Sequence, residues 1–132
     1  MARGKMNTIE RRSVRGGPAV EQLLAAACQA FHLRDIGVLR GNSRVRAISQ
    51  ARCYVASVLR GEGFAFSTPE IGKVLGGKDP STVFYYLKAH PRLLTDDAHS
   101  RRVREAEEIR ERLSRETSEL PIEPVAIEWS PR

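Results

Sequence analysis

The sequence contains few of the residues that mark several common classes of protein. Only 6% of its 132 residues are aromatic, two are cysteines, and no run of about 18 apolar residues occurs. These absences argue against a transmembrane helix and a disulfide framework, and Cys28 and Cys53 fit a reducing cytosol. No apolar stretch follows the charged N-terminus, so no secretory signal is predicted. At this length we expect one compact domain with flanking tails.

The usual arrangements of catalytic and metal-binding residues are missing as well. No G-x-x-x-x-G-K-[ST] phosphate loop occurs, and no nucleophile lies beside a candidate base. Cys28 and His32 are four residues apart on a predicted helix and could form one edge of a metal site, but no second pair of ligands follows. We therefore predict a non-enzymatic protein without metal or cofactor, in which Cys28 is a buried structural thiol.

Positive charge is what the sequence has in excess. It contains 22 Lys and Arg against 16 Asp and Glu, a net charge of +6. Residues 1–17 carry +4, residues 18–60 carry +4 and residues 61–95 carry +1, whereas residues 96–132 carry −3. The basic part indicates an acidic partner such as nucleic acid and no membrane partner, while the acidic end indicates contact with a protein.

Charge and proline divide the chain into four predicted segments. Residues 1–17 form a basic disordered arm, and residues 18–95 form a helical domain. Residues 96–118 form a charged helix with a thin apolar stripe, for which a dimerising coiled coil is the alternative reading. Residues 119–132 form a flexible tail, because its three prolines are not expected to continue a helix.

Apolar residues in the domain recur at helical spacing. One helix is predicted to begin near Pro18, because its apolar residues fall at i, i+3, i+4, i+7, i+8 and i+11. A short helix over Asp35–Leu39 and a longer one ending at Gly61 follow. No alternation typical of strands competes with these patterns, so the predicted fold class is all-α. The residues of the first apolar face are Val20, Leu23, Leu24, Ala27, Cys28 and Phe31.

Two further helices have the proportions of a helix-turn-helix. Ser67 and Glu70 have the spacing of a capping box, and this short helix is expected to stop at two glycines. Asp79 is a candidate N-cap with Pro80 at the first helical position. The last helix is expected to bury Val83, Phe84 and Leu87 and to end before Pro91.

These residues also carry a resemblance to a known family. Ser-Thr-Pro-Glu-Ile-Gly begins at Ser67, and Gly-Gly-Lys-Asp-Pro-Ser-Thr-Val begins at Gly76. The pattern resembles the C-terminal DNA-binding domain of the bacterial replication initiator DnaA, with its Ser-Leu-Pro-Glu-Ile-Gly and Gly-Gly-Arg-Asp-His-Thr-Thr-Val. The resemblance covers roughly residues 19–94. It implies a Trp-repressor-like helix-turn-helix domain that binds a DnaA-box-like site, here without the initiator's ATPase.

The resemblance implies roles for individual residues. Asp79, Pro80 and Ser81 would contact base edges in the major groove from the start of the recognition helix, and Arg44 would enter the minor groove. From the residues alone, Asp-Pro-Ser-Thr is also a good helix start, and the loop of Arg44 is also a solvated basic loop. The residues expected to hold DNA phosphates are Arg46, Arg52, Ser67, Thr68, Lys78, Thr82 and Lys88.

Two positions depart from the pattern of the family. Pro80 stands where the family has His, which removes a donor directed at a base, and Ser81 stands where it has Thr. Because one good base contact changes discrimination by about 1–3 kcal/mol, the bound DNA sequence does not follow from the resemblance.

The predicted function is therefore sequence-specific binding of double-stranded DNA, without ATPase activity. Such a protein would regulate transcription or replication initiation in the cytoplasm, on the nucleoid of a bacterium or for a phage, as a monomer or weak dimer. The alternative is a protein-interaction module with only non-specific affinity for DNA. In that case the C-terminal helix would bind a replication or transcription protein.

Overall fold

The described part of the chain is built from helices. The computed structural model describes residues 17–61 and 63–128, and the side chains up to residue 116, and no strand occurs over these residues. The predicted all-α class is therefore confirmed, and none of the described helices is both long and apolar enough to cross a bilayer. The helices are α2 (Gly17–Ala30), α3 (Ile36–Arg40), α4 (Arg46–Arg60), α5 (Thr68–Val74), α6 (Pro80–Leu93) and α7 (Asp97–Glu128).

Several helices begin where their local sequence predicts. The Asp35 side chain caps α3 by accepting a hydrogen bond from the Val38 N–H. Ser67 and Glu70 form the predicted capping box at the start of α5. Asp79 is the N-cap residue of α6, followed by a proline at the first helical position.

The structure does not describe most of the predicted N-terminal arm, but it does describe most of the predicted C-terminal tail. Of the predicted basic arm, residues 1–16 lie outside the described residues, and Gly17 already belongs to α2. At the other end α7 continues to Glu128, so the prediction that the tail prolines end this helix before residue 119 was wrong. Residues 129–132 lie outside the described residues.

Proline also fails to end α6 where the sequence predicted. The helix passes through Pro91 and continues to Leu93, and beyond the proline the Leu94 N–H still donates to the His90 carbonyl at 3.0 Å. Proline fixes φ near a helical value, so a helix can pass through it when packing offsets the lost backbone hydrogen bond. The prediction that α6 ends before Pro91 was therefore wrong.

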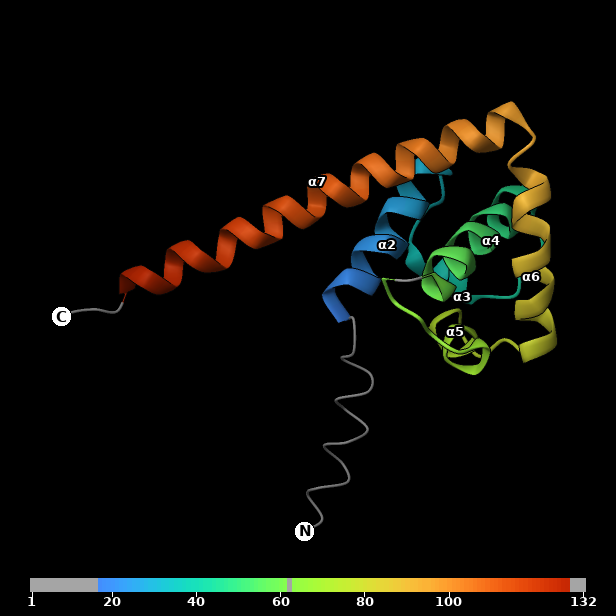
Figure 1. Cartoon of the computed structure of the whole chain (residues 1–132), viewed down its shortest axis with the longest axis horizontal. Coiled ribbons are helices and arrows are strands. Elements are labelled where there is room, and N and C mark those ends of the chain that lie inside the picture. The colour runs from blue at the N-terminus through green and yellow to red at the C-terminus, as the bar shows by residue number, and fades with distance from the viewer. Residues whose placement is uncertain (1–16, 62, 129–132) are drawn as a thin grey trace, which may run out of the picture.

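The core forms around α4, which packs against α6, α2, α3 and α5. α7 begins beside the end of α6, crosses α2 and continues beyond the rest of the fold (Figure 1). The apolar stripe of α7 contributes the buried Ala106 and Ile109, with Val103 and Leu113 partly buried against the core. Its prediction as a charged helix resting on the core by a thin stripe agrees with this packing.

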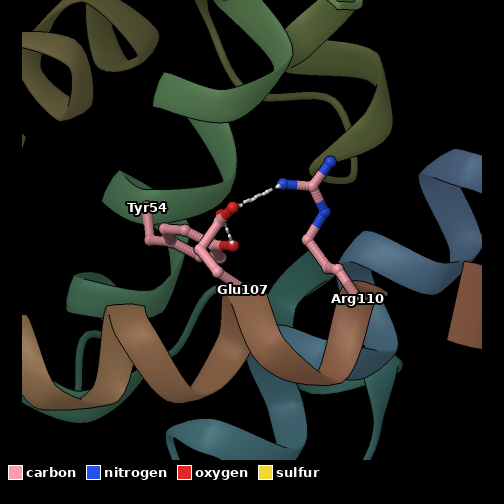
Figure 2. A network of polar contacts seen from close by, with 3 residues as sticks. All are labelled: Tyr54, Glu107 and Arg110. Atoms are coloured by element: carbon pink, nitrogen blue, oxygen red, sulfur yellow. Dashed lines mark hydrogen bonds and ion pairs between the residues drawn. The ribbon is translucent and has the colours of Figure 1, made fainter. Parts of the chain in front are cut away.

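A polar network also joins α7 to α4. The Tyr54 hydroxyl on α4 donates a hydrogen bond to the carboxylate of Glu107 on α7 (Figure 2). Arg110, one turn further along α7, pairs with the same carboxylate at 3.0 Å. Burial, followed by the Glu107 carboxylate, raises the pKa of Tyr54, so the phenol remains the proton donor.

Two histidines are buried where four segments of the chain meet. His90 on α6 and His99 on α7 pack edge to face with ring centroids 5.5 Å apart, and His99 also lies 5.5 Å from the Phe31 ring. Tyr54 of α4 packs against His90 at 6.2 Å. His99 is 1% exposed, and among the described residues neither of its ring nitrogens has a hydrogen-bond partner.

Acidification is expected to destabilise the fold through this histidine pair. Burial lowers the pKa of both His90 and His99 below the ordinary value of 6.5, and for His99 the neighbouring His90 lowers it further. Below about pH 6.5 the unfolded chain therefore binds protons that the folded chain does not. The stability from the neutral pair is complete above this pH and is lost as the pH falls through the folded-state pKa. Urea denaturation between about pH 7.5 and about pH 5 measures the loss.

His99→Phe removes one titrating group from the pair and should flatten this pH dependence. His32→Asn is the matched control, because His32 is exposed and its positive φ of 60° suits asparagine. Asp96 does not interfere, because N–H groups of Ala98 and His99 lower its pKa below the ordinary 3.8. If the free energy of unfolding depends on pH equally in the parent and in the His99→Phe variant, the buried histidine pair is not the cause of the acid destabilisation.

Candidate nucleic-acid interface

The start of α6 presents three exposed residues in a row. Asp79, Pro80 and Ser81 are all exposed, and they are the residues for which the family resemblance implies base contacts. Asp79 occupies the N-cap position, but its carboxylate makes no capping hydrogen bond. Because the carboxylate accepts no hydrogen bond from the N–H groups at the start of α6, it can accept one from another molecule.

The turn between α5 and α6 is tightly packed. Gly76 and Gly77 have φ values of +88° and +89°, which side chains other than glycine rarely adopt. At Gly72 in α5, an added Cβ would lie 2.3 Å from the Lys78 carbonyl oxygen. α5 and the turn before α6 therefore approach as closely as glycine permits, and this fixes the start of α6 relative to α5.

The same turn is docked against the end of α3 and the loop that follows it. A Cβ added to Gly76 would lie 2.2 Å from the Arg40 carbonyl oxygen, so the two backbones are in direct contact. The Arg40 side chain donates to the Val74 carbonyl at 3.1 Å across the same junction. Arg44, the residue expected in the minor groove, lies exposed in this loop. The contacts thus fix the segment that carries Arg44 relative to the start of α6.

Arg52 has a different role from the predicted phosphate contact. Its side chain projects from α4, and the residue is 3% exposed. Its guanidinium donates to four backbone carbonyls in and after α3, so most of its N–H groups are used inside the protein. The structure therefore corrects the prediction: Arg52 stabilises the loop before α4. The accepting carbonyls belong to Val38, Leu39, Gly41 and Ser43.

Lys78 is likewise engaged within the protein. Its half-buried ammonium donates to the carbonyls of Arg40 (3.3 Å), Gly41 (2.9 Å) and Leu75 (2.9 Å). Burial, followed by the nearby Arg52, lowers the pKa of Lys78. Three carbonyls match the three N–H groups of an ammonium. The prediction that Lys78 contacts a phosphate is therefore corrected: its side chain connects the α5–α6 turn to the end of α3 and the loop after it.

The other predicted phosphate ligands differ in accessibility. Arg46 at the start of α4 and Lys88 on α6 are exposed, and Thr82 is half-buried. Ser67 and Thr68 are also half-buried, and the capping box already uses the Ser67 N–H, bonded to the Glu70 carboxylate at 2.8 Å. Arg46 and Lys88 are therefore the clearest charged positions for an anion.

Reasoning from the sequence placed one residue of α6 wrongly, whereas Val83 is buried and Leu87 partly buried as predicted. Phe84, predicted to be buried, is 54% exposed, and its neighbour Tyr85 is 62% exposed. Tyr86 is buried in its place, together with Val83. The spacing i, i+3, i+4, i+7 from Val83 selects Tyr86, Leu87 and His90, so strict helical periodicity would have identified the buried face.

The described residues contain no group suited to metal binding or thiol chemistry. No three His, Cys, Asp or Glu side chains come together over this part of the chain to hold a metal ion. Cys28 and Cys53 are free and buried, and burial raises the pKa of each thiol to about 11. A protonated thiol is a poor nucleophile, so both cysteines act in packing.

Comparison with known proteins finds one region of similarity. Over 65 residues, 49% of this chain, the sequence is 42% identical to the chromosomal replication initiator protein DnaA of Microcystis aeruginosa (strain NIES-843 / IAM M-2473). The similarity spans 14% of the length of that protein. No protein-family model matches the sequence, and no solved structure matches it. About half of this all-α chain is therefore a DnaA-like region.

Proposed function

We propose that this protein binds specific sequences in double-stranded DNA through α5 and α6, acting as a helix-turn-helix of the Trp-repressor type. In this proposal Asp79, Pro80 and Ser81 read base edges in the major groove, and Arg44 enters the minor groove. The protein is a non-enzymatic regulator of replication initiation or transcription, a monomer or weak dimer on the nucleoid in the bacterial cytoplasm. The printed sequence contains no phosphate loop that would add ATP hydrolysis.

One observation carries this proposal: the exposed start of α6 and the loop of Arg44 are fixed to each other. Gly76 packs on the carbonyl of Arg40 at the end of α3, and Lys78 donates to the carbonyls of Arg40 and of Gly41 in the loop that follows. Two elements that are already fixed to each other can contact two neighbouring grooves with little further loss of conformational entropy on binding. The DnaA-like region supports the same reading, since that relative is a chromosomal replication initiator.

Phosphate contacts would position the protein on the duplex without reading its sequence. Arg46 and Lys88 are exposed and suit this role, and each is expected to contribute about 0.9 to the slope of log affinity against log salt concentration. Thr82 near the start of α6, and Ser67 and Thr68 at the start of α5, are proposed as further, neutral phosphate contacts.

A second candidate function is supported by α7. This helix extends beyond the rest of the fold (Figure 1), and the segment from residue 96 to residue 132 carries a net charge of −3. An acidic helix suits contact with a basic protein surface better than contact with DNA. In this reading α7 binds a replication or transcription protein, and the affinity of the domain for DNA is only non-specific.

Selection from random duplexes at about 0.15 M salt tests the proposal. The parent protein is expected to enrich a defined site. Asp79→Ala should reduce discrimination at one base position by about 1–3 kcal/mol, because the exposed carboxylate would accept from a base amino group. Arg44→Ala should weaken the preference for the neighbouring base pairs whose minor groove this side chain would enter.

Arg104→Ala is the matched control, since it removes an exposed arginine from α7 and should leave the selected site unchanged. An unchanged preference after Asp79→Ala would exclude the role proposed for the start of α6. If the parent enriches no sequence and its affinity collapses with salt, the protein-interaction function is favoured.

A further inference from the structure

The accessible side of α6 carries an aromatic face, defined here as Phe84 and Tyr85. These residues lie three and four positions after Ser81, and Lys88 follows after another turn, so the four side chains share one side of the helix. The aromatic rings are 54% and 62% exposed, although aromatic residues make up only 6% of the sequence. Tyr85 also packs beside the buried Tyr86, with ring centroids 6.0 Å apart, which limits its orientations.

The charges around the aromatic face indicate what kind of molecule covers it. α6 contains no acidic residue between Pro80 and Leu93, and Lys88 and Arg92 are exposed on it. On the helix that we propose reads DNA, apolar rings thus lie beside cations. Such a face is complementary to a negatively charged groove that also contains apolar groups. The major groove has this character, because each thymine presents a C5 methyl group between the phosphate chains.

We propose that Phe84 and Tyr85 recognise thymine through its C5 methyl group, and that they form the second turn of the reading surface that Asp79, Pro80 and Ser81 begin. This inference rests on the proposed DNA-binding function and adds to it a class of base and the group on that base. The major groove is about 12 Å wide and admits a helix, so successive turns of α6 would meet successive base pairs. Pro80 and Ser81 supply few groups for hydrogen bonding, so apolar contact with thymine would carry much of the specificity.

Replacing each thymine of the selected site in turn by deoxyuridine tests this inference, because the replacement removes only the methyl group. For the parent protein, one or two replacements should weaken binding about fourfold each, the factor that corresponds to burying one methyl group. Phe84→Ala and Tyr85→Ala should weaken binding to the thymine site, and one of these variants should bind the thymine and deoxyuridine sites equally at the affected position. Both side chains are exposed, so folding of the variants is not at risk.

Leu94→Ala is the control, because Leu94 is 42% exposed at the end of α6 on a different side of the helix. This variant should discriminate thymine from deoxyuridine as the parent does. If Phe84→Ala and Tyr85→Ala both retain the parent's discrimination, the inference is wrong and the aromatic face serves a protein partner. A parent protein that selects no site at all would contradict the DNA-binding function itself, so the two failures are distinguishable.

Discussion

Replacing Arg52 with alanine is expected to lower the free energy of unfolding by about 3–5 kcal/mol, a large share of the roughly 5–15 kcal/mol of a typical domain. The guanidinium is buried and donates to carbonyls that include Leu39 at 2.9 Å, Gly41 at 2.8 Å and Ser43 at 2.7 Å. Without these donors, several backbone acceptors in a largely buried site lose their partners, at about 1–3 kcal/mol each. Urea denaturation followed by circular dichroism measures the change.

Arg46→Ala is the matched control for this variant. It removes the same charge from the exposed first position of α4 and should change the stability by no more than about 0.5 kcal/mol. Arg52→Lys should remain destabilised, because one ammonium lacks the planar array of donors that reaches several carbonyls at once. If the Arg52→Ala protein is instead stable and binds every DNA sequence more weakly, the original prediction of a phosphate contact by Arg52 is supported.

Gly76→Ala is expected to be similarly damaging, with a loss of about 3 kcal/mol or more. Two costs add at this position: a side chain at φ +88° is strained, and its Cβ would lie 2.2 Å from the Arg40 carbonyl oxygen. The clash involves backbone on both sides, so it cannot be relieved by rotating a side chain. The docking of the α5–α6 turn against the loop of Arg44 must open, which thermal or urea denaturation detects.

Gly77→Ala separates the two costs. Gly77 has nearly the same φ, +89°, but an added Cβ would meet no heavy atom within 4 Å. Only the strain of about 1–2 kcal/mol is therefore expected. If the Gly76 and Gly77 variants lose equal stability, the contact with the Arg40 carbonyl contributes nothing and the loop adapts.

The helices that the sequence predicted well are those specified by neighbouring residues. A capping box between Ser67 and Glu70, or a proline after Asp79, acts within one turn and is visible in a short stretch of sequence. The apolar face of α2 follows from spacing alone. The position of the predicted base contacts at the start of α6 follows from the same local signals.

What the sequence did not predict depends on distant partners. An arginine such as Arg52 is usually exposed, and its carbonyl acceptors become apparent only when the loop 9 to 14 residues upstream folds back on α4. His90 and His99 are buried because α6 and α7 pack their rings together beside Phe31 and Tyr54. In each case tertiary packing overrides the ordinary preference of the side chain for water.

The contacts to the Gly41 carbonyl have one more consequence. This oxygen accepts from both Arg52, at 2.8 Å, and Lys78, at 2.9 Å, so two cationic side chains are fixed behind the loop that carries Arg44. A charge attracts a distant anion without touching it, and a partly buried charge is screened by salt less than an exposed one. These two side chains therefore add positive potential at the surface of this loop, which would accelerate the arrival of the DNA that we propose as the partner. In the proposed function these two side chains would add to the rate of association, and the exposed Arg44 would in addition contact the DNA.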